Sequence, residues 1–182
     1  WRENTYPGCA CDVPSALYSY SFAPNPAWSR IFAEQKEIKQ YLFDVVEHYD
    51  VMPHVRLNCE ALKAQWCDVE NCWIIQTAQG ELRSQFAILA CGPMHEPVLP
   101  KVKGIEDFKG EIFHSSQWRH DLDLTGKRVA VIGTGASAVQ FVPQIQPLVE
   151  SLTIFQRTAQ WILPKSDMPL VKPLRTLFKY TL

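Results

Sequence analysis

A short apolar run followed by a glycine-rich turn constrains the fold of this chain most. Arg128 to Ile132 are rich in β-branched side chains, which predicts a buried parallel strand. In the turn that follows, Gly133 allows a tight reversal, Gly135 lets backbone N–H groups approach a pyrophosphate, and Ala138 lets the next helix pack close to the sheet. The first turn of that helix, which includes Ser137, points its unpaired N–H groups and its positive dipole end at the phosphates. The pattern predicts a dinucleotide-binding βαβ unit.

The second strand of this unit indicates which dinucleotide is bound. Ser151 to Phe155 form another short apolar run, and Gln156-Arg157-Thr158 follow it. A site for NAD usually has an acidic residue here, on the ribose 2′-hydroxyl, whereas a guanidinium suits a 2′-phosphate. Arg157 and Thr158 therefore predict an NADP(H) site. The alternative is that Arg157 is a solvated charge at the end of a strand.

A histidine motif precedes the βαβ unit. Phe108-Lys-Gly110-Glu-Ile-Phe-His114-Ser-Ser-Gln-Trp118 resembles the fingerprint of the Baeyer–Villiger monooxygenases, which belong to the wider group of class B, or flavin-containing, monooxygenases. The stricter fingerprint closes with Pro or Asp, where this chain has Arg119. The resemblance makes His114 a candidate catalytic residue that, with Trp118, orders the linker between two domains. Without the motif, His114 reads as a hydrogen-bonded loop residue and Trp118 as a packed aromatic.

The N-terminal stretch Trp1–Tyr18 resembles the flavin-side segment of the same enzymes. The shared pattern is Trp, Asn, Tyr-Pro-Gly, Cys-Asp, Ser and Tyr, on a loop rich in turn signals. The resemblance implies that four residues contact FAD: Asn4, Tyr6, Asp12 and Tyr18. It also implies that Asp12 helps to place a catalytic arginine from later sequence. On the residues alone, Asp12 reads as a carboxylate that closes a turn.

The resemblance implies an α/β fold of paired Rossmann-like, three-layer FAD- and NAD(P)-binding domains with an antiparallel β-meander insertion, truncated at both ends. We expect residues 1–91 to be the C-terminal part of an FAD-binding segment, residues 92–164 the NADP-binding segment, and residues 165–182 the start of a helical substrate domain. The chain begins at Trp1, inside a recognisable loop, so it is expected to be an internal fragment of a longer enzyme.

Periodicity predicts the elements between these motifs. Residues 34–49 carry an apolar stripe at helical spacing that includes Tyr41 and Tyr49, both expected in the core. Strands are predicted at residues 55–58, 62–67, 73–78 and 82–89. Residues 88–92 resemble the family's crossing from a strand into the linker, and Pro93, Pro97 and Pro100 continue that linker.

Composition excludes several classes of function. The chain has 182 residues, of which 47% are hydrophobic, and this supports a buried core. A formal net charge of -1 and the lack of a basic stripe argue against nucleic-acid binding. No apolar run approaches the roughly 20 residues of a membrane span, and no secretory signal is visible. The six cysteines show neither zinc spacing nor a Cys-x-x-Cys pair, so we expect reduced thiols, no metal and a cytoplasmic protein.

The activity implied by the resemblance is NADPH- and FAD-dependent monooxygenation. NADPH reduces FAD, and the reduced flavin reacts with O2 to give a C4a-peroxyflavin that inserts one oxygen into a small-molecule ketone or oxidises a heteroatom. The isolated fragment is expected to be inactive, and its oligomeric state is left open. The alternatives are a non-catalytic NADP-binding fragment, a flavin disulfide reductase, for which Cys9-Ala-Cys11 has the wrong spacing, and a generic NADP-dependent dehydrogenase.

Overall fold

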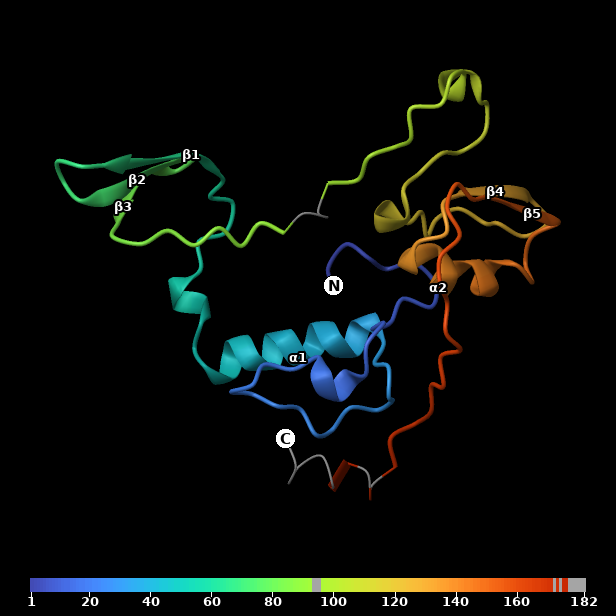
Figure 1. Cartoon of the computed structure of the whole chain (residues 1–182), viewed down its shortest axis with the longest axis horizontal. Helices are drawn as coiled ribbons and strands as arrows, with labels where there is room; N and C mark the ends of the chain where they lie inside the picture. The colour runs from blue at the N-terminus through green and yellow to red at the C-terminus, as the bar shows by residue number, and fades with distance from the viewer. Residues whose placement is uncertain (93–95, 172, 174, 177–182) are drawn as a thin grey trace. The chain divides into compact units, whose positions relative to one another are not determined.

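The computed structural model describes residues 1–92, 96–171, 173, 175 and 176 and has the predicted α/β composition (Figure 1). In chain order the helices and strands are η1 (Ser15–Leu17), α1 (Gln35–His48), η2 (Met52–His54), β1 (Ala61–Cys67), β2 (Cys72–Thr77), β3 (Gly80–Ser84), η3 (Ile105–Asp107), η4 (Ser115–Gln117), β4 (Arg128–Ile132), α2 (Ala136–Ile145) and β5 (Ser151–Phe155), where η marks a 3-10 helix. The chain divides into two compact units, Val46–Glu96 and Trp1–Val45 together with Pro97–Leu182.

The unit Val46–Glu96 contains the predicted antiparallel meander, a sheet of strand order β1-β2-β3 (Figure 1). The turn Asp68–Asn71 joins β1 to β2 and places Asn71 in the left-handed region at φ 49°. A tighter turn at Gly80, with φ 120°, joins β2 to β3. Asn and Gly are the residues that tolerate positive φ most readily, which is why the chain reverses at these two points.

Two of the strand predictions in this unit are wrong in part or in whole. Residues 55–58 form no strand: they follow the 3-10 turn η2 and end at Asn58, whose φ of 54° is incompatible with an extended chain. The strand predicted at residues 82–89 ends at Ser84. The Ser84 hydroxyl donates to the carbonyl of Phe86 and accepts from its N–H at 2.7 and 3.3 Å, a local arrangement that replaces the ladder. Residues 88–92 accordingly have no regular structure.

In the other unit, one core forms around α1 and the loop before it. Ile38 and Tyr41 on the apolar stripe of α1 pack with Trp28, which is 1% exposed, and the core also includes Cys11, Ala33 and Leu170. The stripe is confirmed at Tyr41 but not at Tyr49, whose side chain is 45% exposed. Tyr49 follows the last residue of α1, so the helical spacing no longer directs it towards the core.

The second core of this unit lies within the predicted βαβ motif. Strands β4 and β5 are parallel and paired in register from Arg128↔Ser151 to Ile132↔Phe155, and α2 connects them (Figure 1). Val131 of β4 packs with Phe141 and Ile145 of α2 and with Tyr6 and Cys9 of the N-terminal loop. The N-terminal loop therefore contributes to the core of the βαβ unit.

Two sequence expectations extend beyond the described residues. The predicted linker includes residues 93–95, which lie outside the described residues. The predicted helical segment includes residues 172, 174 and 177–182, which also lie outside the described residues. Among the residues that the structure describes, no helix combines the length and the apolar composition needed to cross a membrane.

Candidate functional site

The glycine turn after β4 is open on its outer side. Gly133 has φ 107°, a conformation that strongly favours glycine, and its N–H donates to the carbonyl of Phe155 at 2.9 Å. A Cβ added at Gly133 or Gly135 would meet no protein atom within 4 Å. Internal packing therefore does not explain a glycine at position 135, whereas a ligand that approaches the backbone from outside does.

The first turn of α2 begins at this glycine turn. Gly135 is the N-cap residue, and no side chain caps the helix. The N–H groups of the first turn lack partners within the helix and carry the positive end of its dipole. Ala138 packs against the core that contains Val131, so its small side chain brings α2 close to β4. The turn thus has the features of an anion-binding helix end.

Arg157 and Thr158 lie at the same edge of the sheet as the glycine turn. Both follow β5, and the carboxyl ends of parallel strands share one edge; Ile132 pairs with Phe155 there. The amide of Gln156 donates to the Thr134 hydroxyl at 3.0 Å and ties the strand end to the turn. The Arg157 side chain is exposed and has no hydrogen bond or ion pair with any described residue. An exposed arginine that pairs with no described residue therefore lies at the edge of the sheet that carries the turn.

Tyr6 connects the predicted flavin-side loop to α2. Its ring is 7% exposed and lies edge-on to Phe141 at 6.1 Å, and its hydroxyl donates to Gln140 Oε1 at 3.4 Å. Burial raises the pKa of Tyr6 to about 12, and the nearby Ser137 hydroxyl opposes this shift. The structure thus gives Tyr6 a packing role against the helix that starts at the glycine turn.

The segment around Ala10 is held along both edges. On one edge, Cys11 N–H donates to Ala33 and Gln35 N–H donates to Cys9, as expected for an antiparallel bridge. On the other edge, the Gln140 side-chain amide accepts from Ala10 N–H at 3.0 Å and donates to Ala10 C=O at 3.1 Å. One side chain of α2 therefore completes the hydrogen bonding of this loop.

Gly8 permits the close approach of the same loop to α2. It has φ 73°, and an added Cβ would lie 2.9 Å from Gln144 Cγ and 3.0 Å from the carbonyl oxygen of Gln140. Real Cβ atoms essentially never come as close as the first of these distances. The Tyr-Pro-Gly turn, which the sequence marked only as a turn, is thus a packing contact with the helix.

The other predicted flavin-side residues are more accessible. Tyr18 is 37% exposed, accepts a hydrogen bond from the Trp1 indole at 2.6 Å, and stacks edge-on with that ring. Asn4 is half-buried and Asp12 is exposed. Within the described part of the chain, neither the Asn4 nor the Asp12 side chain makes a hydrogen bond. The Asp12 carboxylate does not close the turn in which it lies.

Trp118 packs beside α2, and His114 caps the turn before it. The Nδ1 atom of His114 accepts from Ser116 N–H at 3.2 Å and caps η4, so a neutral ring carries its proton on Nε2. Trp118 lies 5.1 Å from the ring of Phe141 on α2. Arg119, at the position where the strict fingerprint has Pro or Asp, pairs at the surface with Asp121 and holds the pKa of that carboxyl at about 2.

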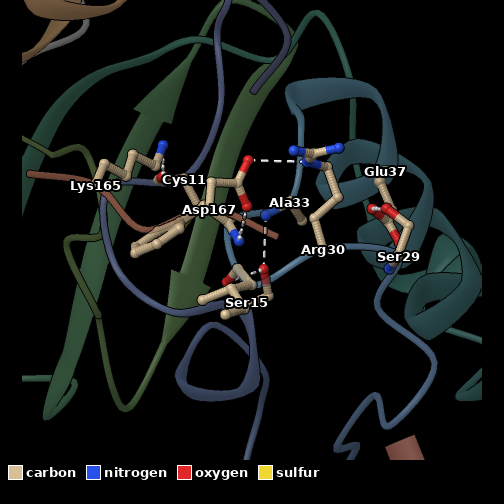
Figure 2. A network of polar contacts seen from close by, with 10 residues as sticks. Cys11, Ser15, Ser29, Arg30, Ala33, Glu37, Lys165 and Asp167 are labelled. Atoms are coloured by element: carbon tan, nitrogen blue, oxygen red, sulfur yellow. Dashed lines mark hydrogen bonds and ion pairs between the residues drawn. The ribbon is translucent and has the colours of Figure 1, made fainter. Parts of the chain in front are cut away.

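The backbone of residues 168–170 pairs with that of residues 29–31 through an antiparallel bridge and two hydrogen bonds. Lys165 Nζ donates to the carbonyl of Cys11 at 2.9 Å and lies over the Phe32 ring at 4.6 Å. Asp167 pairs with Arg30 at 2.8 Å and accepts from Phe32 N–H at 3.3 Å. Figure 2 shows these contacts beside the bond from Ala33 N–H to the Ser15 hydroxyl. The start of the predicted substrate domain is therefore bound to the N-terminal segment by hydrogen bonds and an ion pair.

The structure brings the predicted nucleotide residues together but does not gather all predicted site residues. Gly133, Gly135, Ser137, Arg157 and Thr158 share one edge of the βαβ unit. Among the described residues, no hydrogen bond or ion pair joins His114 or Asp12 to that edge. Sequence reasoning missed Gln140 and Gln156, because one glutamine on a helix and one after a strand carry no distinctive pattern.

The six cysteines form no disulfide with one another. All six are free, and Cys9 and Cys11 are buried, which raises the pKa of both thiols. No group of three or more His, Cys, Asp or Glu residues in the described ranges is arranged to hold a metal ion.

Known proteins are similar to this chain in sequence and in fold. The family described as flavin-binding monooxygenase-like matches residues 4–176. A Baeyer–Villiger monooxygenase of Streptomyces coelicolor is 48% identical over 179 residues, which are 98% of this chain and 34% of that protein. A steroid monooxygenase bound to NADP superposes with a TM-score of 0.87 at 38% identity, over 98% of this chain and 35% of that one. The OTEMO complex with FAD and NADP superposes with a TM-score of 0.85 at 35% identity, over 98% of this chain and 36% of that one. The chain spans about a third of the length of the relatives it matches, and it belongs to the flavin-binding monooxygenase-like family.

Proposed function

We propose that the full gene product carrying this chain is an NADPH- and FAD-dependent monooxygenase. It transfers one atom of O2 to a small-molecule ketone, as a Baeyer–Villiger enzyme does, or to a heteroatom. Family membership supports the reaction class, and the similar Streptomyces protein is named for Baeyer–Villiger chemistry. The proposal concerns the whole protein, because this chain spans about a third of its relatives.

The observation that carries the proposal is the edge of the βαβ unit. An open glycine turn and an uncapped helix N-terminus lie at this edge, and the exposed residue Arg157 follows β5 at the same edge. The N–H groups that follow Gly135 suit a pyrophosphate, with Ser137 in the same turn. Arg157 and the Thr158 hydroxyl suit a ribose 2′-phosphate, because a guanidinium grips phosphate bidentately. This set of donors fits NADPH better than NADH.

The domain assignment is part of the proposal. Residues 92–164 form the NADP-binding segment, residues 1–91 belong to a second Rossmann-like segment that binds FAD, and residues 165–182 begin the helical substrate domain. The complete β4-α2-β5 unit supports the first assignment. The meander of β1 to β3 supports the second, since it is the insertion that the family resemblance implies.

The remaining residues of the chain position these parts. FAD, when bound, would supply the activation of O2 and the oxygen transfer. Asn4, Asp12 and Tyr18 lie along the flavin-side loop, and the exposed Asp12 carboxylate is available to orient a basic residue of the full protein. Tyr6 joins this loop to α2, and Trp118 packs on the same helix. His114 caps the turn that leads to Trp118, so it acts by holding the linker in place.

The experiment that tests the reaction supplies isotope-labelled O2. The purified full gene product would be given NADPH and a panel of cyclic and linear ketones, sulfides and amines. We expect one labelled oxygen atom per molecule of product and one NADPH consumed. Consumption of NADPH with release of labelled hydrogen peroxide, and no labelled product, would instead indicate an oxidase. NADPH binding by a colourless protein would indicate a non-catalytic module.

A flavin disulfide reductase is not favoured by the structure. Such an enzyme needs an accessible cysteine pair beside the flavin. Cys9 and Cys11 in the flavin-side loop are 8% and 0% exposed, and burial raises the pKa of both thiols, which disfavours the thiolate that such an enzyme uses.

A further inference from the structure

Two cysteines face each other at the end of the β1–β2 hairpin. Cys67 is the last residue of β1, Cys72 is the first residue of β2, and the two are partners in the antiparallel register. Partners in such a ladder have their Cα atoms about 4.5 or 5.5 Å apart, according to the type of pair, and their side chains on the same face. A disulfide requires a Cα separation of about 4.4–6.8 Å. Either type of pair meets this requirement.

The surroundings keep both thiols accessible and hold the turn between them. Both cysteines are half-buried and free. Cys67 lines an open pocket of about 280 Å³ together with Lys63 and Glu81, so a small oxidant can reach it. The carboxylate of Glu70, within the turn, pairs with Arg83 of β3 and accepts a weak hydrogen bond from the Cys72 thiol at 3.9 Å. The turn is therefore joined to β3 by the Glu70–Arg83 ion pair, on the face of the sheet that carries the two sulfur atoms.

We propose that Cys67 and Cys72 form a redox-sensitive modification site that closes as a reversible disulfide on reaction with a hydroperoxide. One thiolate attacks the peroxide oxygen, and the O–O bond breaks to give a sulfenic acid and an alcohol, or water when the oxidant is hydrogen peroxide. The second sulfur then displaces the sulfenic hydroxyl, which leaves as water. Two thiols lose two electrons and two protons in total, and the peroxide is reduced by the same two electrons.

The other cysteines do not offer an equivalent pair. Cys9 and Cys11 are buried in two different cores of the unit that contains α1, and one residue of a bridged segment separates them. Cys59 and Cys91 are not register partners of any cysteine among the described strands. The ring closed by a Cys67–Cys72 bond spans only a short turn, so the bond restricts the unfolded chain less than one that closes a long loop would. Its main effect is to lock the end of the hairpin.

The sequence allows a direct test by peptide mapping. The reduced full-length protein would be treated with stoichiometric hydrogen peroxide, and its remaining thiols would be alkylated. Cleavage after Lys and Arg leaves Cys67 and Cys72 alone together on residues 64–83, and further cleavage after Glu70 separates them unless a disulfide joins them. The same treatment in urea gives the rate at which Cys67 and Cys72 form a disulfide in the unfolded chain, where the hairpin does not hold them opposite each other. Dithiothreitol tests reversibility.

We expect the linked pair to form before any other disulfide and at least about tenfold faster in the folded protein than in urea, and to be fully reversed by dithiothreitol. Cys67→Ser and Cys72→Ser should each leave the partner as a sulfenic or sulfinic acid. Independent alkylation of Cys67 and Cys72 in peroxide-treated wild-type protein would overturn the proposal. So would an equal rate in urea, because the folded register would then contribute nothing. Both of these results come from the wild-type chain and do not depend on how well the variants fold.

Discussion

Replacement of Gln140 by leucine tests how the N-terminal loop is attached to the βαβ unit. The Gln140 amide makes two hydrogen bonds to Ala10, at 3.0 and 3.1 Å, in a partly buried position. The other edge of this segment is already paired, so Ala10 N–H and C=O lose their partners in Gln140→Leu. The Tyr6 hydroxyl also loses its acceptor, but that contact, at 3.4 Å, is too long to contribute much. A buried backbone group left without a partner costs about 1–3 kcal/mol. Because water partly reaches this position, we expect a cost of about 1 kcal/mol for each of the two Ala10 groups. The free energy of unfolding should therefore fall by about 2 kcal/mol.

The assay is urea unfolding followed by tryptophan fluorescence, with amide hydrogen exchange at residues 9–11 to localise the effect. Gln140→Glu separates the two bonds, since it keeps the acceptor for Ala10 N–H and places a carboxylate oxygen against Ala10 C=O. Gln140→Glu should lower the free energy of unfolding by at least the contribution of one hydrogen bond. Gln146→Leu is the matched control, because that residue is exposed at the end of α2, and its effect should stay within about 0.5 kcal/mol. If Gln140→Leu is as stable as Gln146→Leu, the proposed attachment is refuted.

Three further perturbations follow from the same structure. Gly8→Ala should lower the free energy of unfolding in urea by about 1–3 kcal/mol, because an alanine there would have a φ of 73° and would also clash with α2. Gly126→Ala has a φ of 66° but open space around the added Cβ, so it should lose only the free energy that a positive φ costs an alanine. Burial raises the pKa of Tyr6 to about 12 in the folded protein, against an ordinary 10 in the unfolded chain. The free energy of unfolding should therefore be unaffected below pH 10 and fall as the pH rises from 10 towards 12, where only the unfolded chain loses the proton. The wild type should lose stability in this range more steeply than Tyr6→Phe. Asp167→Asn should cost less than about 1 kcal/mol, since its pair with Arg30 is half-exposed, and high salt should abolish the difference.

Much of the fold could be predicted from local patterns. The helix at residues 34–49 and the strands on either side of the glycine turn depend on short-range periodicity and on glycine geometry, and the structure contains them at nearly the expected bounds. The meander was also predictable, because turn residues separate runs rich in aromatic and β-branched side chains. The end of β3 was not predictable, since Ser84 stops the strand by a side-chain contact that apolar residues beyond it conceal.

Contacts between distant segments were not predictable from the sequence. Gln140 binds Ala10 across 130 residues, and Asp167 binds Arg30 across 137. Neither residue belongs to a pattern that points to its partner. The βαβ unit that carries Gly133, Gly135 and Arg157 was predictable, because one continuous segment of the sequence forms it, and its binding of a nucleotide stays a prediction. The flavin-side loop could be placed only by resemblance, and its packing on α2 through Tyr6 and Gly8 emerged from the structure.

The most direct test of the NADP assignment compares the binding of NADPH and NADH to the full gene product and to Arg157→Ala. Loss of charge-assisted bonds to a 2′-phosphate costs roughly 1–3 kcal/mol, or about 5- to 150-fold in Kd. We therefore expect weaker NADPH binding by that factor and an unchanged Kd for NADH. Arg128→Ala, an exposed arginine at the opposite end of the β4–β5 pair, should change neither constant. Equal weakening of NADPH and NADH by Arg157→Ala would contradict the account, because Arg157 would then not recognise the 2′-phosphate.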